Sequence, residues 1–162
     1  MLQAVETAGA QSVQACYNLI NPSAGNVVPE GFPFQDFRQL IQKASLRKMG
    51  VIAIRVLAAG ALSGEAQRHS VGARTVSPIG TSRSYAEDIS RARMFQFLVT
   101  EGHVDNLIEA AIRFAISNRV VSTALVGYSS LEQLEQAVQY TNKGPLPATV
   151  LKEIEEASAI GV

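Results

Sequence analysis

Val121–Val138 reads VSTALVGYSSLEQLEQAV, and this stretch indicates the fold. An apolar, β-branched run passes through Gly-Tyr-Ser-Ser into leucines at helical spacing, which predicts a strand followed directly by a helix. Ser130 with Gln133, and Ser129 with Glu132, have the spacing of a capping box at the helix start. Because free backbone N–H groups and the helix dipole converge there, we interpret this helix start as an anion-binding site.

Two further strands are predicted upstream, over Ser12–Ile20 and Val51–Leu57. The second is apolar on both faces, which is typical of a parallel strand covered by helices. Helical spacing of apolar residues predicts helices over about 1–8, 34–49, 85–100, 104–117, 130–141 and 148–159. This order of strands and helices predicts an α/β fold with three parallel strands and flanking helices. Three strands cannot close an eight-stranded barrel, so the sheet is either a small open one or part of a (β/α)8 barrel.

Composition narrows the class of protein. With 162 residues, the chain is most simply one domain over 1–162, and its 14 basic and 14 acidic residues leave no net charge for nucleic-acid binding. We find no apolar run of membrane-spanning length and no signal peptide, so neither a membrane nor secretion is expected. The chain has a single cysteine, Cys16, which excludes an internal disulfide and favours a cytoplasmic location. Because Cys16 lies in an apolar strand, we expect its thiol to be buried and inert.

Several polar residues leave alternatives open. Gln14 and Asn18 share one side of the first strand and are either satisfied polar groups or, for Gln14, an amide that faces a ligand. Arg55 interrupts an apolar strand and needs either an ion pair or a phosphate contact. His69 and His103 have no partner of suitable spacing, so we assign no metal ligand.

The connection Ala58–Ser84 is longer than an ordinary strand-to-helix loop. It begins with the small residues Ala58, Ala59, Gly60 and Ala61, which allow the backbone to approach another group closely. Connections of this length are often functional or mobile.

Three motifs together resemble the C-terminal portion of aldo-keto reductases. They are QACYNLINP at Gln14–Pro22, GVIAIRVLAAGALSG at Gly50–Gly64 and STALVGYSSLEQLEQAV at Ser122–Val138, in order and at the family's spacing. The resemblance covers most of the chain and implies strands six, seven and eight of a (β/α)8 barrel. It further implies a parent enzyme that reduces aldehydes and ketones with NADPH, a tyrosine giving the proton.

The same resemblance implies that the catalytic half is missing. In the family, the tyrosine, aspartate, lysine and histidine of the active site lie on strands two to four and the loops after them. The tyrosines of this chain match none of those positions; they are Tyr17, Tyr85, Tyr128 and Tyr140. We therefore assign no catalytic residue and leave open whether this chain is an enzyme.

The resemblance does assign cofactor contacts for NADP(H). Gln14 corresponds to the amide at the nicotinamide, Leu57 to Gly60 to the loop at the pyrophosphate, and the last motif to the contacts of the 2′-phosphate. The implied cofactor-binding residues are Gln14, Leu57, Ala58, Gly60, Gly127, Ser129, Ser130 and Gln133.

Other positions depart from the family. They are Ile54 for an aromatic residue, Arg55 for serine, Val56 for proline, Glu65 for lysine, Ser130 for arginine, Gln136 for glutamate and Ala137 for asparagine. Arg68 or Arg74 in the long connection is a candidate replacement for the missing phosphate contacts.

We expect a truncated or split aldo-keto reductase, with this chain as its cofactor-binding half. The alternative is a non-catalytic half-barrel that binds a nucleotide or associates with itself. Because open parallel sheet edges need pairing or cover, we expect a homo-oligomer or a complex with the complementing N-terminal half. A small carbonyl substrate is expected only for the completed barrel.

Overall fold

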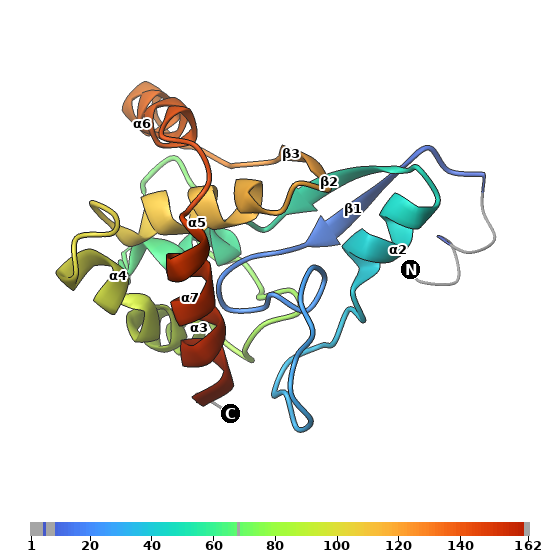
Figure 1. Cartoon of the computed structure of the whole chain (residues 1–162). Coiled ribbons are helices and arrows are strands. Elements are labelled where there is room, and N and C mark those ends of the chain that lie inside the picture. Colours follow the sequence, from blue (N-terminus) through green and yellow to red (C-terminus); the bar gives the residue numbers. More distant parts are fainter. Residues whose placement is uncertain (1–4, 6–8, 68, 161–162) are drawn as a thin grey trace.

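A computed structural model describes residues 5, 9–67 and 69–160 (Figure 1). The strands β1 (Ser12–Cys16), β2 (Gly50–Ile54) and β3 (Val121–Ala124) form one parallel sheet in the order β1-β2-β3. The three parallel strands expected from the sequence are therefore confirmed. The helix expected over residues 1–8 lies almost wholly outside the described residues.

Helices lie in the connections between the strands, and further helices follow β3 in the C-terminal part of the chain. The α-helices are α2 (Leu40–Leu46), α3 (Tyr85–Ala92), α4 (Phe97–Thr100), α5 (Leu107–Ser117), α6 (Leu131–Asn142) and α7 (Ala148–Ile160). The short 3₁₀ segments are η1 (Ala58–Ser63) and η2 (Arg93–Phe95). No helix in the described part of the chain combines the length and the apolar character needed to cross a bilayer.

The two faces of the sheet differ in their surroundings. Ala15 and Ala53 are fully buried on the face that packs against α2 and α5. On the other face, the register places Gln14 beside Ile52 and Ile52 beside Thr123. Gln14 and Thr123 are exposed, and Ile52 is half-buried. Among the described elements, helices therefore cover one face of the sheet only.

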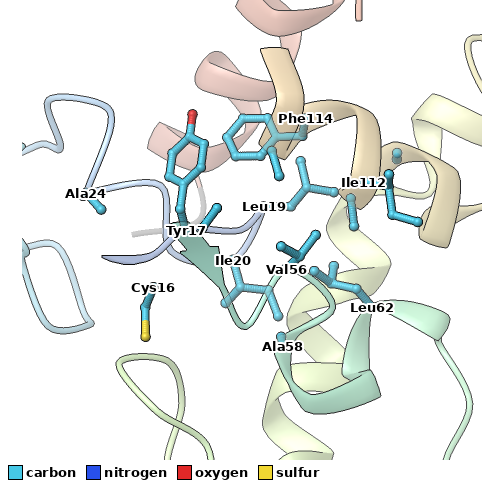
Figure 2. Close-up of a cluster of buried hydrophobic side chains, with 14 of the residues drawn as sticks. Cys16, Tyr17, Leu19, Ile20, Ala24, Val56, Ala58, Leu62, Ile112 and Phe114 are labelled. Atoms are coloured by element: carbon cyan, nitrogen blue, oxygen red, sulfur yellow. The ribbon is translucent and has the colours of Figure 1, made fainter. Parts of the chain in front are cut away.

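The core lies between the covered face and the helices. Tyr17, just after β1, stacks on Phe114 of α5 with ring centroids 4.9 Å apart (Figure 2). Leu19, Val56 and Leu62 pack in the same buried cluster, so the segments that follow β1 and β2 share it with α5.

The strands end earlier than the sequence analysis predicted. β1 ends at Cys16 rather than Ile20 because the Asn18 side chain accepts a hydrogen bond from the Asn21 backbone N–H at 2.9 Å and turns the chain. β2 ends at Ile54 rather than Leu57 because Arg55 adopts a left-handed conformation with φ 58°. Asn18 Nδ2 donates to the Arg55 carbonyl at 2.9 Å and joins the two strand ends. Asn18 is therefore a satisfied polar group, the first alternative for this residue.

The helix predicted over 34–49 is shorter, although its buried side is as expected. Arg38 and Gln39 have positive φ values of 52° and 55°, which a right-handed helix cannot contain, so α2 begins at Leu40. The Ile41 N–H donates to Ala24 O at 2.9 Å, so the loop after β1 satisfies the start of this helix. Apolar residues at helical spacing predict a core-facing stripe in this stretch, and all of its members are buried; they are Phe37, Leu40, Ile41, Ala44 and Met49.

The helix predicted over 85–100 is interrupted, and the one over 104–117 starts later. The first divides into α3, η2 and α4. The second begins at Leu107 because Asn106 is its N-cap, with Oδ1 accepting from the Glu109 N–H at 3.0 Å.

α6 contradicts the predicted core-facing side of its helix. The helical spacing of Leu131, Leu134, Ala137 and Val138 predicts a core-facing side. Leu131 and Val138 are instead 64% and 52% exposed. The helix reaches the core through Tyr140, whose hydroxyl accepts a hydrogen bond from Asn106 Nδ2 at 2.7 Å. α6 lies at the top of Figure 1 and contacts α5, and half of its apolar side has no cover among the described residues.

A buried carboxylate connects α5 to the chain after α6. Glu109 is only 1% exposed, and its oxygens accept from Arg113 Nη1 and from Lys143 Nζ, each at 2.8 Å. The backbone N–H of Asp105 donates to the same carboxylate at 3.1 Å. A buried charge needs such partners, since an unpaired one is costly. This network joins the C-terminal end of α6 to the start of α5.

We expect Glu109→Gln to lower the free energy of unfolding by about 3 kcal/mol, because it leaves two cations against a neutral amide. Urea denaturation followed by circular dichroism measures the change. The matched control is Lys152→Gln, which removes the exposed pair between Lys152 and Glu156 on α7. This control should change the free energy by less than about 0.5 kcal/mol. Equal effects of the two variants would show that the buried network contributes nothing special.

Candidate functional site

The largest cavity that combines the predicted motifs lies where β2 and β3 end. Its volume is about 940 Å³, and three segments line it: the end of β2 with η1, the long connection before α3, and the β3–α6 junction. In parallel sheets, ligands bind at the carboxyl ends of the strands, and this cavity has that position. We define it as the strand-end cavity.

Five of the eight predicted cofactor residues line the strand-end cavity; they are Leu57, Gly60, Gly127, Ser129 and Gln133. Ala58 is buried behind the lining, and Ser130 is the N-cap of α6. Gln14 is separate from them, since it lies on the uncovered face of the sheet in β1. The structure thus brings the second and third motifs together, and it leaves the Gln14 contact a prediction.

The β2 side of the cavity has an unusual backbone. Ala58 and Ala59 have φ values of 46° and 59°, and Gly60 has a φ of 100°. Left-handed conformations are rare for residues with a side chain, and such strain concentrates at functional sites. The turn is closed by the Gly60 N–H, which donates to Leu57 O at 2.8 Å. Small side chains at these positions let a ligand approach the main chain.

The α6 start has the N-cap bond predicted for Ser130 with Gln133, whereas the described hydrogen bonds include no capping bond between Ser129 and Glu132. Ser130 Oγ accepts from the Gln133 N–H at 3.3 Å, and Gln133 Oε1 accepts from the Ser129 N–H at 2.7 Å. Hydrogen bonds from the Ser130 hydroxyl and from the Glu132 backbone N–H also hold the pKa of the Glu132 carboxyl below its usual value. Several donors of the predicted anion site are therefore engaged by the chain's own side chains, and a carboxylate lies beside them.

Arg55 lines the strand-end cavity. No ion pair between the described side chains includes it. Of the two alternatives for this residue, the position beside a ligand is the one that the geometry favours, because an unpaired guanidinium in a cavity suits an anionic ligand.

The long connection crosses the cavity and reaches α6. The Gly72 N–H donates to His69 O at 2.9 Å, and a Cβ added at Gly72 would lie 3.5 Å from Ser129 Oγ. At its far end, the buried Asp88 carboxylate accepts from Thr81 Oγ1 at 2.7 Å and from the Ser82 N–H at 2.9 Å. The connection therefore approaches the α6 start near its middle, where it forms one wall of the site, and is hydrogen-bonded to α3 at its far end.

Sequence reasoning missed most of this wall. A second cavity of about 600 Å³ adjoins the strand-end cavity. The two are lined in part by residues that the sequence did not indicate: Tyr85, Tyr128, Gln136 and the stretch around 69–76. The excessive length of the connection was the available signal. Arg74 lies in the adjoining cavity, and Arg68, the other candidate for a phosphate contact, is outside the described residues.

Cys16 has the environment expected of an inert thiol. Its side chain is buried, and burial raises the pKa of the thiol while the charge of Arg55 opposes that rise. A raised pKa keeps the sulfur protonated, so it is a poor nucleophile.

Comparisons with known proteins agree with this arrangement. A family model described as "Aldo/keto reductase family" matches residues 9–159. The aldo-keto reductase AKR11C1 from Bacillus halodurans is similar in its holo form, with a TM-score of 0.59 and 21% identity over 96% of this chain and 45% of that chain. The apo form of the same protein gives a TM-score of 0.53 and 20% identity, over 96% of this chain and 44% of that chain. No curated protein matches the chain.

The chain spans less than half the length of these two solved structures. Its three parallel strands and their helices correspond to a partial (β/α)8 barrel, which confirms the predicted fold class. Because the family model covers nearly the whole sequence, this chain belongs to the aldo/keto reductase family.

Proposed function

We propose that this chain is the cofactor-binding part of an aldo-keto reductase and that its strand-end cavity binds NADP(H). The observation that supports this most is the meeting of Leu57, Gly60, Gly127 and Ser129 around one cavity, although they come from segments far apart in the sequence. The resemblance to aldo-keto reductases assigns the same residues to the cofactor.

The cavity suits a nucleotide in several respects. A volume of about 940 Å³ lies within the range of small-molecule sites. Small residues expose the main chain at Gly60 and Gly127, and Arg55 supplies positive charge for a pyrophosphate. The 2′-phosphate position fits less well, because the Ser129 N–H already donates to Gln133 and the Glu132 carboxylate lies close by.

When bound, the cofactor would supply a hydride for a carbonyl carbon. This chain's residues would bind and orient the nucleotide, and the proton donor would come from a further polypeptide segment. Under this proposal the substrate is a small aldehyde or ketone, and the completed barrel is the enzyme.

We also propose that the two edge strands of the sheet pair with the segment that completes the barrel, so that the uncovered face lies inside it. Gln14 and Thr123 are exposed on that face, and β1 and β3 are edge strands. Exposed parallel edges favour pairing with another segment. Leu131 and Val138 add an uncovered apolar stripe on α6.

The same exposed stripe favours a second function, a half-barrel module that associates with itself and binds a nucleotide without catalysis. In either case, we propose a cytoplasmic location, because a single buried cysteine suits a reducing compartment.

Gly127→Leu should weaken NADPH binding by more than about tenfold, because its side chain would fill the cavity. A Cβ at Gly127 meets no atom within 4 Å, so the variant should fold normally. Titration of NADPH fluorescence with the full chain measures the affinity.

Gly9→Leu is the matched control for that substitution, since a Cβ at Gly9 also meets nothing within 4 Å and Gly9 is outside the cavity. It should bind NADPH as the unmodified chain does. A flat fluorescence signal at high protein concentration, or equal binding by both variants, would contradict the proposed site.

Val138→Lys should reduce association of the chain with itself or with a complementing segment, because it puts charge into the uncovered stripe of α6. Analytical ultracentrifugation across a concentration series measures the shift toward the mass of one chain. Val27→Lys is the control, since Val27 is 73% exposed in the loop after β1. A monomer at every concentration for the unmodified chain would contradict self-association.

A further inference from the structure

Three potential metal ligands meet where the turn between α4 and α5 approaches α7. Glu101 directly follows α4, His103 lies in the turn before α5, and Glu153 lies on α7. His103 Nε2 is 3.4 Å from Glu101 Oε2 and 3.2 Å from Glu153 Oε2. The three ligand atoms lie within 4.8 Å of one another. None of the three residues lines the strand-end cavity.

Two of these atoms have no hydrogen-bond partner among the described residues. His103 Nε2 and Glu153 Oε2 are both inaccessible to solvent; they lie at ion-pair distance from each other, but neither makes a hydrogen bond. Buried polar atoms almost always make a hydrogen bond, so two facing atoms that make none require an explanation. One cation between them would satisfy the imidazole nitrogen and the carboxylate oxygen together.

The spacing indicates which cation fits. Zinc binds histidine nitrogen and carboxylate oxygen at about 2.0–2.2 Å in a tetrahedral arrangement, so neighbouring ligand atoms lie about 3.3–3.5 Å apart. The measured 3.4 and 3.2 Å agree with two edges of such a tetrahedron. Magnesium and calcium prefer oxygen ligands only, and an imidazole nitrogen disfavours them.

We propose that Glu101, His103 and Glu153 bind a Zn²⁺ ion, with a water molecule as the fourth ligand. Two carboxylates balance the charge of the ion, and a neutral imidazole completes the protein ligands. Glu101 is the most exposed of the three side chains and has room to rotate toward the ion. The site is distinct from the proposed nucleotide site and does not depend on it.

The ion would connect α7 to the turn between α4 and α5. α7 otherwise contacts the body through η2 and through buried residues such as Val150 and Ile154. A ligand that binds only the folded chain stabilises it in proportion to its concentration. Zinc binding at this position would therefore stabilise the attachment of the C-terminal helix.

Short spacings in the sequence do not indicate this metal site. Glu101 lies two positions before His103, but the third ligand comes from another helix far along the chain. Only the packing of α7 brings it close.

The test is isothermal titration of ZnCl₂ into the full chain after metal removal with a chelator. We expect one zinc per chain and a higher melting temperature with zinc. His103→Gln and Glu153→Gln should each weaken binding by more than about 100-fold, because even groups behind the ligands typically cost 10–100-fold. If His103→Gln does not fold, Glu153→Gln decides the matter.

Two controls separate this site from adventitious binding. Glu156→Gln removes another α7 carboxylate, and His69→Gln removes the other histidine; both should bind zinc as the unmodified chain does. Co²⁺ bound in place of zinc should show the visible absorption of a tetrahedral ion. The proposal would be overturned if the unmodified chain did not bind zinc or bound MgCl₂ equally well. It would also be overturned if loss of His103 or Glu153 left zinc binding unchanged.

Discussion

The parallel pairing of β2 with both β1 and β3 is the constraint on which the other features depend. Parallel strands cannot be joined by tight turns, so each connection must cross the sheet and return. The crossovers place α2 and α5 on one face and direct the ends of β2 and β3 to the same edge. The core, the uncovered face and the strand-end cavity are consequences of that arrangement.

Polar side chains determine where the elements stop. Asn18 turns the chain after β1 and bonds to the carbonyl of Arg55, so the ends of two neighbouring strands are joined directly. Glu109 performs a similar function between α5 and Lys143, and Asp88 attaches the long connection to α3. Each is buried and satisfied, as polar groups in a core must be. The apolar residues supply the driving force for burial, and these polar groups decide the path of the chain.

Much of the fold was readable because local patterns and tertiary packing agree. The buried stripe of α2 and the capping box of α6 were correct, since both depend on residues three or four positions apart. Element ends were less accurate, because Arg38, Gln39 and Arg55 adopt left-handed conformations that no periodicity signals. Part of the predicted core side of α6 was wrong, because a helical stripe shows only that apolar surface exists, and Leu131 and Val138 have no described neighbour to cover them.

The candidate site was likewise predicted in part from the sequence and in part only from the structure. The sequence by itself determined the family, the parallel α/β class and the residues of two motifs, because those depend on residue type and order. Only the tertiary structure decided that these motifs share one cavity, that Gln14 lies apart from it and that Glu153 reaches His103. The physical reason is distance along the chain: contacts between remote segments follow from how the crossovers pack, and no local spacing in the sequence records them.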